Sequence, residues 1–524
     1  MNHVESDKAS ISTIRLFLCC LILALLVNVL LYPSVFEWKP FGINAPIYLI
    51  CFYLIMSIAL WPNFRLFSCP IHMIFTLLFS ICFVFITNGF LLFLCAVGIV
   101  LLLGEQIMLS LHQARYPKDS IYLIGDSMIF WFGYPFMGMG KALSSYFVSG
   151  NAKKTRGVLI GILITLPVAL IILLLLGSAD AVYQQFLQNL FGQINVVNIL
   201  LHLFIFIIAF CLLSGTFWSC LNKPKRPAAA RSPHKAIPFQ WIAQSILLVI
   251  VNLVLLSFSL IQFCYLFFGH VPEGLTYSQY ARSGFWQLII VSILVAAILL
   301  FSWKCEKPAN PKAWPLKKAL LTLLCLGVLV LLISAFWRMV LYEGAYGLTR
   351  LRVDTQAFMI VFALAIIFVI VKLWIPKFAL RKIVAVVALA CFSLLCLFAS
   401  DGFIARQNVA LQGEEADYVY LSSLSCDALP YYIDQLNEED FANTVEIVRL
   451  GGYNSLVPHI PGELTRDEYY AILEISNHIY GQHYQLLKRT IPWQYYNYNR
   501  DLARQSMVEH KELISDILYI AKNA

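Results

Sequence analysis

Long apolar segments separated by short polar connections occupy most of the first 400 residues. Most of them hold about 20 residues, the length that a helix needs to cross the hydrocarbon core of a bilayer. Backbone groups inside a bilayer must be hydrogen-bonded within the chain, so such segments form helices. The pattern predicts an all-α polytopic transmembrane helical bundle of about eleven spans: 16–32, 46–61, 70–88, 90–110, 157–177, 196–218, 240–268, 285–303, 317–341, 355–374 and 382–400.

The segment 121–140 is apolar but does not fit this pattern. It contains Asp126, Pro135 and four glycines, which weaken a membrane-spanning helix. We expect it to be an interfacial or re-entrant piece, with backbone buried in protein.

The distribution of basic residues orients the predicted spans. Connections on the cytoplasmic side are enriched in Lys and Arg. The connection 178–195 has no basic residue, whereas those after spans four, six, eight and ten are basic. The sequence therefore predicts a multipass protein of the plasma (inner) membrane with a cytoplasmic N-terminus and an extracytoplasmic C-terminal tail.

The chain after residue 403 has a different pattern. Apolar residues recur at helical spacing in 440–450 and 466–487, and a last helix is expected over 499–520. Residues 221–238 are rich in Pro, Ala and bases, as is typical of flexible linkers. We predict an N-terminal transmembrane part (1–220), a cytoplasmic basic linker (221–238), a C-terminal transmembrane part (239–403) and a small helical tail domain (404–524).

Composition supports the membrane assignment. Hydrophobic residues make up 60% of the chain and charged residues 13%, against about 25% charged residues in soluble domains. From residue 401 onward there are eighteen acidic and nine basic residues, so the net charge of +8 comes from a basic membrane part and an acidic tail. The bases are scattered over short connections, which argues against nucleic-acid binding.

Arginines gather in connections that this topology places outside, where bases should be scarce. The richest stretch is 337–354, WRMVLYEGAYGLTRLRVD. Arginine binds carboxylate or phosphate with a planar fork of two hydrogen bonds, as lysine cannot. The candidate ligand-binding residues are Arg282, Arg338, Tyr342, Glu343, Tyr346, Arg350, Arg352, Asp354, Asp401 and Arg406.

Two interpretations of this cluster remain open. In the first, the arginines form a pocket at the outer interface for a carboxylate, an anionic lipid headgroup or a polyprenyl phosphate. In the second, Glu273, Glu343, Asp354 and Asp401 pair with the arginines and fix the connections to one another, because charges near a bilayer are usually paired.

Isolated polar residues also occur within predicted spans. Glu105 lies in LLLGEQIML and is a candidate intramembrane relay for protons or ions. We expect the others to form hydrogen bonds between helices: Asn28, His72, His202, Asn252 and Gln262. Fourteen cysteines include no C-x-x-C pair, and the sequence contains no recognisable motif for a metal, a cofactor or a catalytic set.

The chain resembles an uncharacterised prokaryotic family of multipass membrane proteins, catalogued only as a domain of unknown function. The resemblance is carried in order by GSAD (177–180), YSQYARSGFWQL (277–288), LYEGAYGLTRLRV (341–353), DGFIARQNVA (401–410), ADYVYLSSLSCDALP (416–430) and IPWQYYNYNRDLARQSM (491–507). It implies a helical integral membrane protein and no known substrate. Where the family tends to have Asp-Trp-Arg, this chain has Pro492-Trp493-Gln494.

Two classes of function follow from these features. The first is a non-enzymatic envelope protein that is transporter-like or senses a ligand, without a cofactor. The second is a lipid-linked glycosyl or phosphoryl transferase, which needs an acidic residue on the outer face. Glu37 is the candidate in the first outer connection, which is short for a catalytic platform. A structural partner of another membrane protein is a third possibility.

Overall fold

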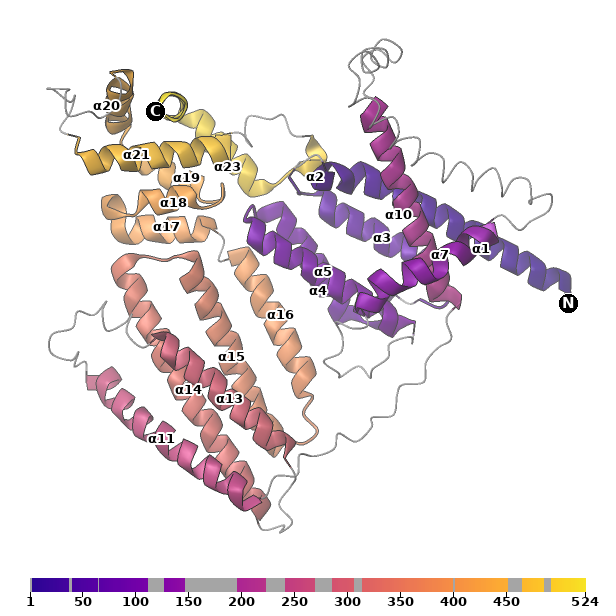
Figure 1. The fold of residues 1–524 in the computed structure, drawn as a ribbon, viewed down its shortest axis with the longest axis horizontal. Coiled ribbons are helices and arrows are strands. Elements are labelled where there is room, and N and C mark those ends of the chain that lie inside the picture. The colour runs from indigo at the N-terminus through magenta and orange to yellow at the C-terminus, as the bar shows by residue number, and fades with distance from the viewer. Residues whose placement is uncertain are drawn as a thin grey trace, which may run out of the picture. The chain divides into compact units, whose positions relative to one another are not determined.

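The computed structural model describes residues 2–36, 40–64, 66–111, 127–146, 196–222, 241–268, 285–305, 313–398, 401–450, 464–484 and 492–524. Every element in these ranges is a helix (Figure 1). Seven of the described helices are long and apolar enough to cross a membrane. The predicted all-α polytopic helical bundle is confirmed, and the chain is an integral membrane protein.

The chain divides into two compact units. The first contains residues 1–85, 89–230 and 491–498, and the second contains 86–88, 231–490 and 499–524. Residues 86–88, which connect α4 (Pro70–Phe85) to α5 (Gly89–Ser110), therefore belong to the second unit.

Apolar helices form the first unit, and each predicted span in its described residues coincides with one of them. The first span contains a π-helical turn. Buried side chains such as Leu23, Met56 and Phe217 form a shared core. The elements are α1 (Asn2–Leu26), η1 (Val27–Leu31), α2 (Tyr32–Phe36), α3 (Asn44–Ala59), α4 (Pro70–Phe85), α5 (Gly89–Ser110), η3 (Ile129–Gly133), α7 (Tyr134–Tyr146) and α10 (Val196–Asn222). The predicted span 157–177 lies outside the described residues.

The described part of the segment 121–140 is helical and packs against α10. Its π-helical turn η3 comes just before Pro135, which lacks a backbone N–H and clashes with a preceding carbonyl in a regular helix. A Cβ on Gly138 would come within 2.1 Å of the Gly215 carbonyl oxygen, and one on Gly215 within 2.1 Å of the Pro135 carbonyl oxygen. Glycine is required at both positions because the backbones of α7 and α10 touch.

Two expected interhelical hydrogen bonds are confirmed. The Asn28 side chain donates to the His202 carbonyl oxygen at 2.5 Å. Asn252 donates to the carbonyl oxygen of Leu320 at 3.1 Å, which links α11 (Trp241–Phe268) to α14 (Ala313–Tyr346). These polar residues therefore hold membrane helices together.

Five long helices form the membrane part of the second unit. Their core contains Leu248, Leu324, Val328 and Ile366. The helices are α11 (Trp241–Phe268), α13 (Phe285–Lys304), α14 (Ala313–Tyr346), α15 (Arg350–Trp374) and α16 (Leu380–Phe398). The spans predicted at 317–341 and 355–374 are too short. Helix α14 continues to Tyr346 and α15 starts at Arg350, so only residues 347–349 connect them.

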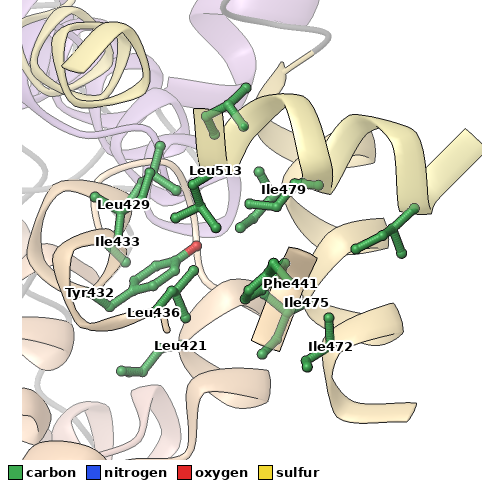
Figure 2. Close-up of a cluster of buried hydrophobic side chains, with 14 of the residues drawn as sticks. Leu421, Leu429, Tyr432, Ile433, Leu436, Phe441, Ile472, Ile475, Ile479 and Leu513 are labelled. Carbon is green, nitrogen blue, oxygen red and sulfur yellow. The ribbon is translucent and has the colours of Figure 1, made fainter. Parts of the chain in front are cut away.

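The tail consists of short helices around a core of its own. Figure 2 shows Tyr432, Phe441, Ile475 and Leu513 converging there, all with at most 5% of their surface exposed. The elements are α17 (Asp401–Gln412), η4 (Gly413–Glu415), α18 (Tyr418–Ser423), α19 (Leu429–Tyr432), η5 (Ile433–Gln435), α20 (Glu438–Arg449), α21 (Arg466–His478), η6 (Ile479–Tyr484), α23 (Tyr498–Glu509) and α24 (Lys511–Asn523). The turn η7 (Trp493–Tyr495) belongs to the first unit.

The single last helix predicted over 499–520 is wrong. The helix is interrupted at His510, whose φ of −100° and ψ of 48° are not helical. The imidazole Nε2 of His510 lies 3.0 Å from Asp434. The break gives α24 its own direction, and its buried residues Ile517 and Ile520 join the tail core.

Candidate functional site

The turn between α14 and α15 is fixed by one side chain of α17. Gly347 ends α14 with φ of +70°, a conformation that favours glycine. The Asn408 carboxamide accepts a hydrogen bond from Leu348 N–H at 2.6 Å and donates one to Leu348 O at 2.9 Å. A Cβ on Gly347 would come within 2.8 Å of Asn408 Oδ1. The first helix of the tail therefore holds the end of two membrane helices.

Next to this turn, Arg350 and Asp401 form a bidentate ion pair. Arg350 Nε donates to Asp401 Oδ1 at 2.6 Å, and Arg350 Nη2 donates to Oδ2. Asp401 also accepts from Ser425 N–H at 3.0 Å and from the Asn88 carboxamide at 3.3 and 3.4 Å. We call these four residues the Asp401 junction. It joins α15, α17, the segment after α18 and the connection 86–88.

The junction buries a charged carboxylate. The side chain of Asp401 is 2% exposed and that of Arg350 is 40% exposed. Burial alone raises the pKa of Asp401, but hydrogen bonds and charge from Arg350, together with Ser425, outweigh it and hold that pKa below its usual range. Both carboxylate oxygens accept at least two hydrogen bonds each, so Asp401 is a structural anion rather than a base.

Arg352 lies two residues beyond Arg350 and makes different contacts. Its Nη1 donates to the carbonyl oxygens of Gly347 and, at 3.3 Å, Tyr346. Its guanidinium carbon lies 4.3 Å from the centre of the Tyr342 ring, a cation–π contact. Among the described residues, Nε and Nη2 of this half-buried side chain have no hydrogen-bond partner. Arg352 can therefore accept an additional anion.

The acidic neighbours are partly engaged. Glu343 Oε2 accepts from Gln356 at 2.6 Å, which ties α14 to α15. Its other oxygen is buried and has no hydrogen bond among the described residues. Asp354 is half-buried one turn after Arg350 and experiences the charges of Arg350 and Asp401.

The remaining predicted residues are placed less centrally. Arg338 is buried in α14 with 9% of its surface exposed, and Tyr346 is 54% exposed at the end of α14. Arg406 is exposed on α17, two positions before the buried Asn408, so the two side chains leave the helix about 200° apart. Arg282 and Glu273 lie outside the described residues, as does Glu37. The structure brings together Tyr342, Glu343, Tyr346, Arg350, Arg352, Asp354 and Asp401 around the ends of α14 and α15.

The tail contains a second buried carboxylate, that of Asp427, which no pattern in the sequence indicated. Asp427 accepts from Thr87 N–H at 3.1 Å and from the Thr87 hydroxyl at 2.5 Å. The thiol of Cys426 donates to the same hydroxyl oxygen at 3.3 Å. Burial raises the pKa of Asp427 to about 6, which the hydrogen bonds from Thr87 oppose and the charge of Asp401 reinforces. The motif 416–430 contains Tyr420, Ser425 and Asp427, but nothing in the sequence linked it to residues 87 and 88.

Glu105, the candidate relay, lies in the first unit. Its Oε1 is 3.2 Å from His72 Nε2, so these two polar residues of different helices meet. Its carboxylate is 7% exposed.

A family model described as a domain of unknown function (DUF4153) matches residues 73–435. The chain belongs to this family. No curated protein and no solved structure matches the chain. The family match covers Glu105, the turn and all residues of the Asp401 junction. It ends before the motif 491–507, the last of the stretches that carry the resemblance.

Proposed function

We propose that this DUF4153 protein is a ligand-sensing membrane protein of the cell envelope, with an extracytoplasmic tail domain and a site for an anionic headgroup at Arg352. The observation that carries the proposal is the bridging position of Arg352. One nitrogen holds the Gly347 carbonyl of the turn, and the other two have no hydrogen-bond partner among the described residues. Tyr342 stacks on the same guanidinium.

The turn provides a path from such a ligand to the tail. An anion held by Nε and Nη2 of Arg352 pulls on the same guanidinium group whose Nη1 donates to the carbonyl oxygens of Gly347 and Tyr346. The adjacent residue, Leu348, is hydrogen-bonded to Asn408 of α17. Movement of the turn therefore reaches the tail through Asn408 and through Tyr420, whose hydroxyl accepts from Arg350 N–H at 2.9 Å. The Asp401 junction provides a fixed point. This arrangement favours sensing over transport.

The ligand chemistry is that of a phosphate carried at the membrane surface. Arg352 is at the end of an apolar helix, where lipid headgroups lie, and arginine binds phosphate through two parallel hydrogen bonds. An anionic lipid and a polyprenyl phosphate share this group. A transferase is less favoured because the buried acid of the site, Asp401, already accepts hydrogen bonds on both oxygens.

Replacing Arg352 with glutamine should weaken binding of phosphatidylglycerol to the purified protein by about 10- to 100-fold, because a charge-assisted hydrogen bond contributes about 1.5–3 kcal/mol. Native mass spectrometry with nanodiscs that contain or lack this lipid measures the loss. Arg406→Gln is the matched control, since it also removes one arginine charge. Arg406 lies on the face of α17 that points away from Asn408 and the turn. Equal binding by the two variants, or a protein that carries no lipid, would contradict the proposal. Added polyprenyl phosphate that displaces the lipid would identify the second source of phosphate.

The proposed orientation has a separate test. Reporter fusions after residues 235, 312 and 420 should show the first two sites in the cytoplasm and the third outside, because basic connections stay inside. A cytoplasmic reporter at 420 would place the tail, and with it Arg352, on the opposite face.

A further inference from the structure

Three membrane helices of the first unit carry polar side chains that meet one another. Helix α3 contributes Tyr53, α4 contributes His72 and Thr76, and α5 contributes Glu105 and Gln106. His72 and Thr76 are four residues apart and therefore share one face of α4. Polar groups inside a bilayer are costly and tend to mark a path for protons or ions.

His72 and Glu105 are the groups in these helices that can carry charge at neutral pH. His72 Nε2 lies 3.2 Å from Glu105 Oε1. The Glu105 side chain is 7% exposed, whereas that of His72 is 21% exposed. One member of the pair is therefore shielded, and the other can exchange protons with its surroundings.

The rest of the network holds the pair in place. The Tyr53 hydroxyl donates to Gln106 Oε1 at 2.6 Å and lies 2.7 Å from Thr76 Oγ1. Because Tyr53 has a single hydroxyl proton, it accepts the hydrogen bond from Thr76 when it donates to Gln106. Gln106 and Thr76 are fully buried. Tyr53 thus holds α4 at Thr76, one turn from His72, and α5 at Gln106, the residue after Glu105.

Bases on neighbouring described helices are engaged elsewhere. Arg15 of α1 donates to the Trp61 carbonyl oxygen at 2.9 Å. Lys141 of α7 lies over the Trp218 ring, 5.6 Å from its centre. His202 of α10 bonds to Asn28. Among the described residues, His72 is therefore the base that is placed to neutralise the charge of Glu105.

We propose that His72 and Glu105 form a proton-binding site in the membrane helices of the first unit, loaded through the partly exposed imidazole. With neutral His72 and ionised Glu105 the pair has a net charge of −1, which is unfavourable in apolar surroundings. Uptake of one proton from water forms an N–H bond on the imidazole or an O–H bond on the carboxyl group, and the pair becomes neutral overall. The proton then lies between Nε2 and Oε1.

The site is close to one end of both helices, which suggests the direction of loading. His72 is the third residue of α4, and Glu105 is five residues before the end of α5. The hydroxyls of Ser68 and Ser110 lie 2.6 Å apart beyond the pair. This arrangement gives the proton a polar entrance at the end where α4 begins.

Infrared difference spectra of the protein in phosphatidylcholine nanodiscs, recorded between about pH 8 and about pH 6, test the proposal. The spectra are recorded in an Asp427→Asn background, because that buried carboxyl group also takes up a proton near pH 6. With His72 and Glu105 intact, this protein should show a protonation signal from a shielded carboxyl group or its imidazolium partner. The signal should be lost in Glu105→Gln and in His72→Gln. It should be kept in Glu414→Gln, a control on the exposed surface of the tail, because exposed glutamates stay ionised in this range.

Identical spectra from the Asp427→Asn protein with and without Glu105→Gln would overturn the proposal and leave a purely structural hydrogen bond. If both variants fold poorly, ¹³C-glutamate labelling of wild type decides the matter. Between the two pH values the label must shift a glutamate carboxyl band that appears on protonation, or a carboxylate band that is perturbed when its imidazole partner gains the proton. Absence of any labelled glutamate change would also overturn it.

Discussion

Replacing Asp401 with alanine should destabilise the second unit by about 2–4 kcal/mol. The substitution leaves the guanidinium of Arg350 without its carboxylate and removes the acceptor of Ser425 N–H and of Asn88. Breaking a fully buried ion pair costs about 3–5 kcal/mol, and the 40% exposure of the Arg350 side chain reduces that figure. Chemical unfolding in detergent micelles measures the change in free energy.

Two comparisons separate the lost pair from a general effect of substitution. Glu414→Ala removes an exposed carboxylate of the same tail and should change stability by less than about 0.5 kcal/mol. The double variant Arg350→Met/Asp401→Ala should be less destabilised than the sum of the single variants, because the unpaired charge is gone. Additive effects would show that Arg350 and Asp401 do not act as a pair.

The stability of the second unit should increase by about 1 kcal/mol between about pH 7 and about pH 5 because of Asp427. Its pKa is about 6 in the folded protein against 3.8 ordinarily, so in this range the folded state binds a proton that the unfolded state does not. The stabilisation grows as pH falls through 6 and is complete below 3.8. Over that whole interval it amounts to about 3 kcal/mol.

The groups that face Asp427 determine how this prediction is tested. Thr87, Asn499 and Cys426 surround the carboxyl group, and Asp401 and Arg500 act through their charges. Asp427→Asn should abolish the increase, as measured by unfolding at each pH. Asp401→Asn should lower the pKa of Asp427, since it removes a negative charge that raises it. The pKa of Asp401 itself is lowered, so its own stabilisation is lost only at more acidic pH, below 3.8. An unchanged pH profile in Asp427→Asn would contradict the assignment.

The clustering of arginines was visible in the sequence, but their partners were not. The stretch 337–354 identified Arg350 and Arg352 as unusual because arginine beside an apolar span is costly. Their roles depend on distance. Arg350 faces Asp401, whereas Arg352 folds back onto the turn and the ring of Tyr342. Two arginines that are two residues apart thus became a fixed ion pair and a candidate binding group.

The connections between helices were the least predictable elements. Hydropathy ended α14 near residue 341 because the following residues are polar, but hydrogen bonds to Gln356 and Asn408 let the helices continue to within three residues of each other. The tail helix predicted over 499–520 is broken at His510, where the partner Asp434 comes from a distant part of the chain.

The sequence by itself determined that this protein is a helical bundle in a membrane with a polar helical tail. Length and apolarity suffice for that, because a bilayer admits only segments whose backbone is hydrogen-bonded internally. Tertiary structure alone decided which polar and charged side chains contact one another. Thr87 and Asn88 reach Asp427 and Asp401 across more than 300 residues, and His72 reaches Glu105 from another helix. Periodicity along one helix contains no information about the side chains that a neighbouring helix brings within hydrogen-bond distance.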